Sequence, residues 1–303
     1  MVIIMATKIY RGEKKYKFNI FPYLCLVPVF TFLILFLVRP FVFAFIKSFY
    51  DYDAAARNNF IGFGNYITLF RDDMVFRKSV KNLWIFLVFL IPSFAMPILV
   101  AEMIFHLKSI KAQNVYRTVM IIPMVVPLVI TVLIWKFLYY PSIGLFNRLL
   151  SNMHLNEINF LGDEKTVKLS IIMIGFPWVS GLNLLMAFAA LQNIDVEMLE
   201  AANLDGASGI KRIISIELPL ILPQLKTLFI ICMCGVIQDY EKILILTNGG
   251  PNNASMVPGL HMYSMAFSTE NASKFGYSCC IAVVMFAVIF TLSIIMLRIK
   301  KKK

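Results

Sequence analysis

Four polar side chains stand close together near the end of a long apolar stretch. Gln238, Asp239, Glu241 and Lys242 follow a mostly apolar run that begins near residue 219. Charged groups inside a membrane span are rare and commonly belong to a substrate or ion path, and an amide with a carboxylate can bind hydroxyl groups. Asp239 and Lys242 are also three residues apart, the spacing at which two side chains pair on one helix face. A binding role and a structural ion pair both stay open.

The histidines and cysteines do not suggest a second reactive cluster. His106, His154 and His261 lie in separate segments, whereas an enzyme embedded in the membrane would need His, Asp or Glu gathered at one face. All five cysteines lie in apolar runs and are interpreted as small hydrophobic residues. The chain also lacks the ATP-binding loop of the G-x-x-x-x-G-K-S/T type. We therefore expect no catalytic residue, no metal site and no cofactor in this chain.

A third group of polar and small residues lies between two apolar runs, at residues 200–223. Ala and Glu are strong helix formers, so Glu200–Ala202 favours a short helix. Gly206, after Asp205, is a natural end for that helix, and Pro219 suits the first turn of the next one. The pattern predicts a helix, a glycine turn, an amphipathic link and then a membrane span.

The composition around these groups is that of a membrane protein. Of the 303 residues, 59% are hydrophobic and 15% are charged, and the mean hydropathy is +0.77. A soluble protein of this length could not bury so much apolar surface. The apolar runs are long and do not alternate, which favours helices over a barrel. Six runs of about 20 residues or more predict six transmembrane helices: 20–46, 83–105, 118–140, 169–191, 219–246 and 276–297.

The basic residues predict that both termini face the cytoplasm. The net charge of +12 comes from Lys and Arg at span ends and in short loops, which indicates a role in topology rather than nucleic-acid binding. With cytoplasmic termini, the inner segments hold fifteen basic residues and the outer loops ten. The expected organisation is a basic cytoplasmic segment (1–19), one membrane domain (20–298) and a basic cytoplasmic tail (299–303).

The spacing within residues 200–223 matches a known pattern. Glu200-Ala201-Ala202 is followed after three residues by Gly206, and after nine more by Ile216 and Leu218-Pro219. This resembles the Glu-Ala-Ala coupling loop of binding-protein-dependent ABC importer permeases. Over residues 22–298 the chain also resembles the carbohydrate permeases, in particular the maltose-type first membrane subunit. The matching points include residues 60–66, Tyr116-Arg117, Trp135, residues 246–251 and Gly276-Tyr277, and the lysine-rich tail differs from the glycine-rich tail of the second-subunit type.

The resemblance implies an all-α polytopic membrane protein with six transmembrane helices and a type I ABC importer permease core. It implies a non-catalytic subunit that passes a sugar or oligosaccharide from an extracytoplasmic binding protein across the cell membrane. A second permease subunit and two cytoplasmic ATPases would complete the transporter, with ATP and Mg held by the ATPases. The coupling loop would cover about 192–218, and its ATPase contacts would be Glu200, Ala201, Ala202, Asp205 and Gly206.

The resemblance also implies a substrate path, but the family's hydrogen-bonding residues are missing there. This favours a passage wall in this subunit and affinity in the binding protein. Trp178 would stack on a sugar ring or pack in the core, and Asn183 would bridge helices. The implied path residues are Met124, Leu128, Gly175, Trp178, Val179, Leu182, Cys232 and Val236, to which the polar cluster adds Gln238 and Asp239.

Two other classes of protein remain as alternatives at this stage. One is a membrane-embedded acyl or glycosyl transferase, which would need the clustered acidic and histidine side chains described above. The other is a self-contained channel, which would have no use for a cytoplasmic Glu-Ala-Ala helix. Co-purification with an ATPase would separate both from a transporter subunit.

Overall fold

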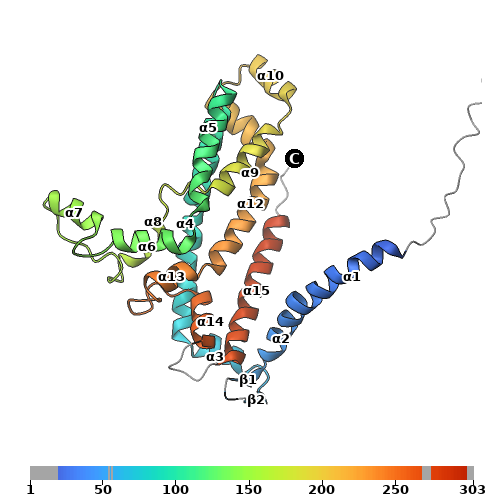
Figure 1. Cartoon of the computed structure of the whole chain (residues 1–303), viewed down its shortest axis with the longest axis vertical. Coiled ribbons are helices and arrows are strands. Elements are labelled where there is room, and N and C mark those ends of the chain that lie inside the picture. Colours follow the sequence, from blue (N-terminus) through green and yellow to red (C-terminus); the bar gives the residue numbers. More distant parts are fainter. Residues whose placement is uncertain (1–19, 54, 56, 268–273, 299–303) are drawn as a thin grey trace, which may run out of the picture. The chain divides into compact units, whose positions relative to one another are not determined.

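The computed structural model describes residues 20–53, 55, 57–267 and 274–298. The predicted cytoplasmic segments at the two ends, 1–19 and 299–303, lie outside these residues. The chain divides into two compact units, one that ends at Ile46 and one that starts at Lys47. Helices make up nearly all of the regular structure in both units (Figure 1).

The first unit is a long, exposed apolar helix. It consists of α1 (Phe21–Leu33), a π turn (Ile34–Val38) and the start of α2 (Arg39–Lys47). A proline ring clashes with the carbonyl group four residues earlier in a regular helix, and the wider π turn relieves this clash at Pro40. The stretch Tyr23–Lys47 has a mean hydropathy of 2.5, and none of its most apolar window is buried. Its side chains are therefore available to lipid.

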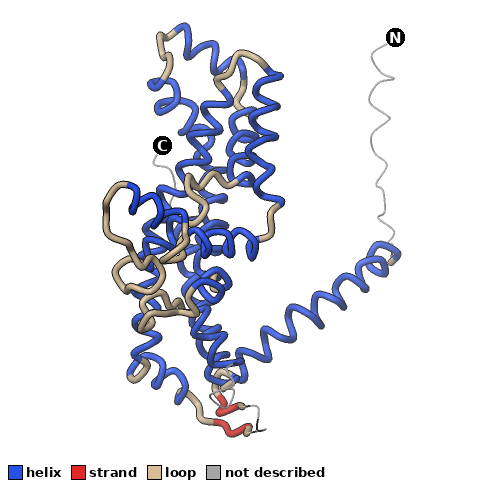
Figure 2. Tube along the Cα trace, turned by 60° about the vertical axis from the view of Figure 1, so that its left-hand side comes forward, coloured by secondary structure: helices blue, strands red, loops and turns tan. Residues whose placement is uncertain are grey.

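The second unit begins with a small hairpin. The strands β1 (Tyr50–Tyr52) and β2 (Asn58–Phe60) pair antiparallel, and α3 (Gly64–Arg71) follows them. Asn65 is buried and fastens the hairpin to α3, because its Nδ2 donates to the carbonyl groups of Ser48 at 2.8 Å and Tyr50 at 3.0 Å. These two strands are the only ones among the residues that the structure describes (Figure 2).

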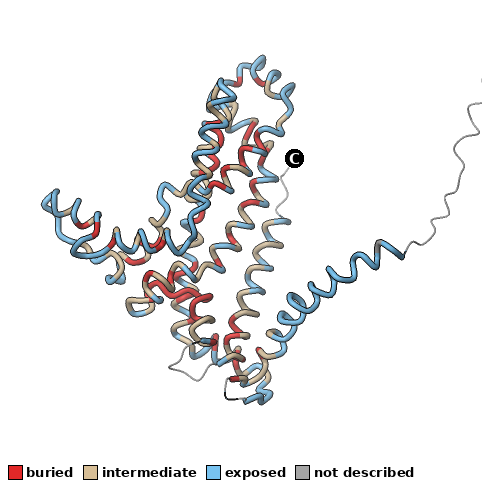
Figure 3. Tube along the Cα trace, in the orientation of Figure 1, coloured by how far each residue is buried: buried red, intermediate tan, exposed pale blue. Residues whose placement is uncertain are grey.

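Four helices form the core of the second unit. They are α4 (Met74–Phe105), α9 (Gly181–Gln192), α12 (Leu218–Gln238) and α15 (Phe275–Arg298). α4 packs against α9 and α12, and α12 packs against α15. Ile98, Leu184 and Phe188 are buried between α4 and α9. Buried residues gather along the facing sides of these helices, while most outer faces stay exposed (Figure 3).

Two of the predicted spans are broken, and a third is interrupted near its end. α5 (Ile110–Ile121), a 3-10 turn (Ile122–Val125) and α6 (Leu128–Leu138) bend by 85° next to Pro127. α8 (Val167–Met173) ends before Pro177, and α9 starts only at Gly181. α12 ends at Gln238, and α13 covers Glu241–Leu246. The predicted spans over 118–140 and 169–191 are each broken in this way, because proline disfavours helix at its own and the preceding position.

The remaining helices lie beside the four-helix core or at its ends (Figure 1). α7 (Leu145–Asn152) follows α6, and α14 (Pro258–Phe267) packs on α15 and α4. In Figure 1 the hairpin and α3 lie at one end of the second unit, and α10 (Val196–Leu204) lies at the other. Among the described residues, four helices are long and apolar enough to cross a membrane, or up to six if each bent pair counts as one span.

Candidate functional site

The helix predicted around Glu200 is confirmed, and so is its glycine end. α10 runs from Val196 to Leu204, and Gly206 follows with a φ of +76°. The Gly206 N–H donates to the Asn203 carbonyl at 3.1 Å, and the Ala207 N–H donates to the Ala202 carbonyl at 2.9 Å. This pair of hydrogen bonds is the Schellman arrangement, in which a glycine in the left-handed region ends a helix and satisfies its last carbonyl groups.

The exposed face of α10 differs from the one expected. Glu200, Ala201 and Asp205 are exposed, as a docking role requires. Ala202 is only 5% exposed and packs within this chain, so its small size serves the packing of the loop itself. Leu204, which the sequence pattern did not single out, is 89% exposed.

The link after α10 is helical earlier than predicted. α11 (Ile210–Arg212) directly follows Gly209, and a π turn (Ile213–Glu217) joins it directly to α12. Ile210–Leu246 therefore forms one long candidate span. Pro219 lies in the first turn of α12, as expected, but α12 continues directly from the π turn before it. Pro219 follows a π turn, as Pro40 does, and the wider turn accommodates the proline ring inside a continuous helix.

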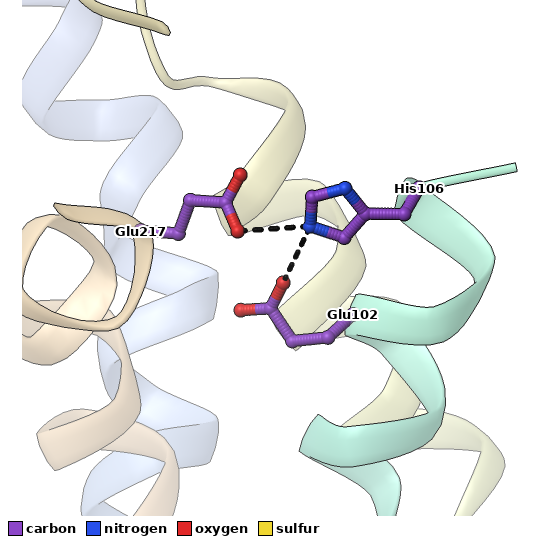
Figure 4. Close-up of side chains that lie close together, drawn as sticks. All are labelled: Glu102, His106 and Glu217. Carbon is purple, nitrogen blue, oxygen red and sulfur yellow. Dashed lines mark hydrogen bonds and ion pairs between the residues drawn. The ribbon is translucent and has the colours of Figure 1, made fainter. Parts of the chain in front are cut away.

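A polar chain of contacts ties the 192–218 loop to the end of α4. The guanidinium group of Arg212 donates to Asn203 Oδ1 at 3.3 Å and to Glu217 Oε1 at 2.8 Å. Glu217 is fully buried, and its Oε2 lies 3.0 Å from His106 Nε2. Glu102, one turn before His106, points into the same space (Figure 4). Sequence reasoning missed this cluster, because His106 and Glu217 are 111 residues apart.

A cavity of 140 Å³ lies at the other end of α12. Trp178, Val236 and Asp239 are among its lining residues, together with Ser93 and Lys242. The Asp239–Lys242 ion pair forms, with Oδ2 and Nζ 2.8 Å apart. It does not lie on one helix face, because α12 ends at Gln238 and the Asp239 backbone is extended. The pair therefore spans the break between α12 and α13 and faces the cavity.

Trp178 lies in the break between α8 and α9 rather than on a helix. Its φ is +59°, and its indole N–H donates to the Ile172 carbonyl at 2.8 Å. The ring of Phe176 meets it edge to face at 5.0 Å. The polar atom of the indole is satisfied within the chain, so the side chain offers the cavity its ring and no hydrogen-bond donor.

The other expected path residues do not join this cavity. Asn183 bridges helices as expected, because Cys232 Sγ of α12 donates to Asn183 Oδ1 of α9 at 3.4 Å. Val179 packs against the core between α4 and α9. The remaining expected path residues are exposed in this chain and do not line this cavity: Met124, Leu128, Gly175, Leu182 and Gln238.

A second polar network lies at the hairpin end of the bundle and was also missed. Asp73 Oδ1 accepts from the Phe76 N–H at 2.7 Å and so caps α4. Asp73 Oδ2 accepts from the Tyr277 hydroxyl at 2.6 Å and lies 2.7 Å from His261 Nε2. Burial raises the pKa of Asp73, but the hydrogen bonds from Tyr277, the Phe76 N–H and His261 outweigh burial and lower that pKa. The network joins α4, α14 and α15.

Comparison with known proteins gives matches over nearly the whole chain. The "Probable ABC transporter permease protein YurN" of Bacillus subtilis is 29% identical over 93% of this chain and 97% of its own length. The "Trehalose/maltose transport system permease protein MalF" of Thermococcus litoralis is 28% identical over 95% of this chain and 96% of its own length. These relatives are therefore similar in length and organisation to the present chain.

A solved structure and a family pattern agree with these relatives. A chain in the crystal structure of a bacterial alginate ABC transporter, in complex with an alginate pentasaccharide-bound periplasmic protein, superposes with a TM-score of 0.79. The two chains are 23% identical, and the match covers 91% of this chain and 92% of the other. The expected permease fold is thereby confirmed. The family pattern matches residues 75–303, so the chain belongs to the family described as "Binding-protein-dependent transport system inner membrane component".

Proposed function

We propose that the chain is a permease subunit of an ATP-driven importer that passes a sugar or oligosaccharide across the cell membrane. The names of the relatives support a carbohydrate substrate, since one is a trehalose/maltose permease and another, from Streptomyces coelicolor, belongs to a diacetylchitobiose uptake system. The apolar character of the path residues supports a passage wall rather than a high-affinity site. Affinity would then reside in an extracytoplasmic binding protein.

The observation that carries this proposal is the continuity between α10 and the cavity. α10 is a capped, exposed helix at one end of the bundle. After Gly209 a continuous helical stretch, made of α11, the π turn and α12, leads from the loop to Gln238, next to the break where Asp239 and Lys242 face the cavity. A displacement of α10 would be transmitted along this helix, because a packed helix moves as a rigid element. Such a connection is what a transporter driven from the cytoplasm needs.

The proposed partners follow from this arrangement. Two cytoplasmic ATPases would each receive a coupling helix, and in this chain the contacts would be Glu200, Ala201, Asp205 and Leu204, with Gly206 as the pivot. ATP and Mg would be bound by the ATPases, and this chain would contribute no catalytic residue. A second permease subunit would complete the pore, and its interface is expected on the exposed apolar faces of the membrane helices.

The orientation is part of the proposal. We place both termini and the 192–218 loop in the cytoplasm, and the hairpin, α3 and α14 outside. The excess of Lys and Arg in the inner segments supports this orientation. The course of α4 and α15 is consistent with it, since both run from the hairpin end toward the α10 end (Figure 1).

Co-purification and stimulated hydrolysis together test the proposed function. The chain, expressed with the permease and ATPase subunits encoded beside it, should retain the ATPase through purification. After reconstitution, the binding protein loaded with its sugar should stimulate ATP hydrolysis above the level with empty binding protein, across a panel of mono- and oligosaccharides. A chain that retains no ATPase would overturn the transporter assignment. Retention with no sugar that stimulates hydrolysis would overturn only the substrate class.

A further inference from the structure

Three potential metal ligands converge at the end of α4 that lies nearest the 192–218 loop. Glu102 and His106 are four residues apart and share one face of α4, and Glu217 reaches them from the π turn before α12. His106 Nε2 lies 3.0 Å from Glu217 Oε2 and 3.8 Å from Glu102 Oε2. One donor atom from each residue can be chosen so that all three lie within 4.8 Å of one another. Figure 4 shows the three side chains pointing toward a common centre.

Glu102 is the group that the rest of the protein does not account for. It is 3% exposed, and neither of its carboxylate oxygens has a hydrogen-bond partner among the residues that the structure describes. A buried carboxylate without donors is strongly unfavourable, and such groups in native proteins usually mark an ion or a functional site. Arg212 gives it no hydrogen bond, because the guanidinium group donates to Oε1 of Glu217 and to Oδ1 of Asn203.

The charge balance leaves room for a cation. Two carboxylates face one guanidinium group, since Glu217 is paired with Arg212 and the only basic side chain of the described residues within ion-pair distance of Glu102 is the His106 ring, at 3.8 Å. Access is available, because the His106 side chain is 32% exposed. Glu102 and His106 also line a groove of 760 Å³ whose other walls are mostly apolar. An ion could therefore enter from the edge at which His106 lies.

We propose that Glu102, His106 and Glu217 bind a divalent transition-metal ion of the zinc class. One imidazole nitrogen and two carboxylate oxygens are suitable ligands for such an ion, with water in a fourth position. Bonds of about 2.0–2.2 Å in a tetrahedral site place the donor atoms about 3.4 Å apart. The observed distances of 3.0 and 3.8 Å lie on either side of that value. Small side-chain rotations would bring the three donors to it.

The ion would fasten the start of the α11–α12 helix to the end of α4. Glu217 also holds Arg212, and Arg212 holds Asn203 of α10. The site therefore shares Glu217 with the chain of contacts that anchors α10. Bound metal would stiffen this anchor, and its removal would loosen the 192–218 loop relative to α4. This inference concerns residues of this chain and holds whether or not the proposed substrate class is correct.

Metal binding by the purified full-length chain, with whatever subunits accompany it, tests the site. After treatment with a chelator, the protein should take up about one Zn²⁺ per chain, measured by elemental mass spectrometry after gel filtration. Co²⁺ should produce the visible absorption of a four-coordinate site in the wild-type protein. Glu102→Gln, His106→Gln and Glu217→Gln should each weaken Zn²⁺ binding by more than about tenfold. His154→Gln, at an exposed loop histidine, should bind as the wild type does.

A second measurement, the unfolding temperature with and without Zn²⁺, tests the site even if one of the variants folds poorly. Zn²⁺ should raise the unfolding temperature of the wild type and of His154→Gln, and should leave that of His106→Gln unchanged. Absence of both the Co²⁺ absorption and the Zn²⁺-dependent shift in the wild type would overturn the proposal, and would mean that the two carboxylates share a proton instead. Equal Zn²⁺ affinity in wild type and His106→Gln would also overturn it, because the ion would then bind elsewhere.

Discussion

Replacing Gly206 tests the proposed role of α10 directly. Its φ of +76° lies in the left-handed region, and a Cβ built at this position would meet no atom within 4 Å. A side chain is therefore disfavoured by the backbone conformation and not by a clash with the rest of this chain. Ala or Val at position 206 should disturb the end of α10 and leave the membrane helices folded.

The expected size of the effect follows from the backbone. The left-handed region disfavours a residue with a Cβ by roughly 1–2 kcal/mol, which changes a conformational ratio by a factor of about 5–30. Val should lie at the upper end of this range, because a β-branched residue is a genuine outlier at positive φ. Asn tolerates the left-handed region much better and also ends helices in this way. Gly206→Asn is therefore the matched control.

The assay compares the four proteins at equal levels in the membrane. ATPase retention during purification and sugar uptake should both fall in the order Gly206, Asn, Ala, Val, with the unfolding temperature of the membrane part unchanged. Wild-type retention and uptake in Gly206→Val would refute the assignment of this turn as the coupling pivot. A defect in Gly206→Asn as large as that in Gly206→Val would refute the conformational explanation, since any side chain would then be harmful.

Four further predictions concern other parts of the molecule. Leu204→Asp should reduce ATPase co-purification but change stability by less than ~0.5 kcal/mol, because the side chain is 89% exposed. Asp239→Asn should slow sugar uptake without loss of assembly, measured as uptake kinetics. Asp73→Ala should lower the unfolding temperature more than Asp73→Asn, since Asn still caps α4, which is worth ~1 kcal/mol. Because the pKa of Asp73 is lowered in the folded protein, its carboxylate stabilises the fold fully above pH 3.8. This stabilisation should be lost as the pH falls through the lower folded-state pKa, and thermal unfolding measured against pH would show the loss. Cysteine at Asn156 should react with an impermeant thiol reagent on intact cells, and cysteine at Glu197 only after permeabilisation.

Specific outcomes would contradict each of these. Full ATPase retention in Leu204→Asp would place the docking surface elsewhere. Unchanged uptake in Asp239→Asn would leave the carboxylate with only its ion pair to Lys242. Identical unfolding curves of wild type and Asp73→Asn between pH 3 and pH 6 would show that the carboxylate adds nothing beyond the cap. Labelling at Glu197 from outside would invert the topology.

The local features of this chain could be predicted well from the sequence. Glycine adopts the left-handed conformation that ends a helix more readily than any other residue, so the position of the α10 end followed from Gly206 alone. The long apolar runs likewise predicted α4 and α15, because hydrocarbon leaves a helix as the only way to satisfy the backbone. The breaks within the spans were harder to predict, since the hydropathy of a run does not show where its backbone changes direction. Gly175 and Pro177 were a readable signal for the break that contains Trp178.

The non-local features could not be predicted in this way. Glu102 has no helical neighbour that could pair with it except His106, and nothing in the spacing indicates that Glu217 reaches the same place. The burial of the Ala202 side chain could not be predicted from the sequence either, because it depends on how the whole loop folds back on its own residues. Asp73, His261 and Tyr277 come from three helices that meet only in the finished bundle. In each case the information lies in the packing of segments that are distant in sequence.

The buried position of Glu102 has a consequence for the synthesis of the protein. α4 leaves the ribosome long before Glu217 does, since His106 and Glu217 are 111 residues apart. At roughly 5–20 residues per second, α4 waits about 6–22 s in the membrane with the Glu102 carboxylate unaccompanied. Its place near the end of α4 lets that carboxylate remain in the interfacial water during the wait. The cluster of Glu102, His106 and Glu217 can form only once Glu217 has been made, so assembly of this corner is delayed until the second half of the chain has been made.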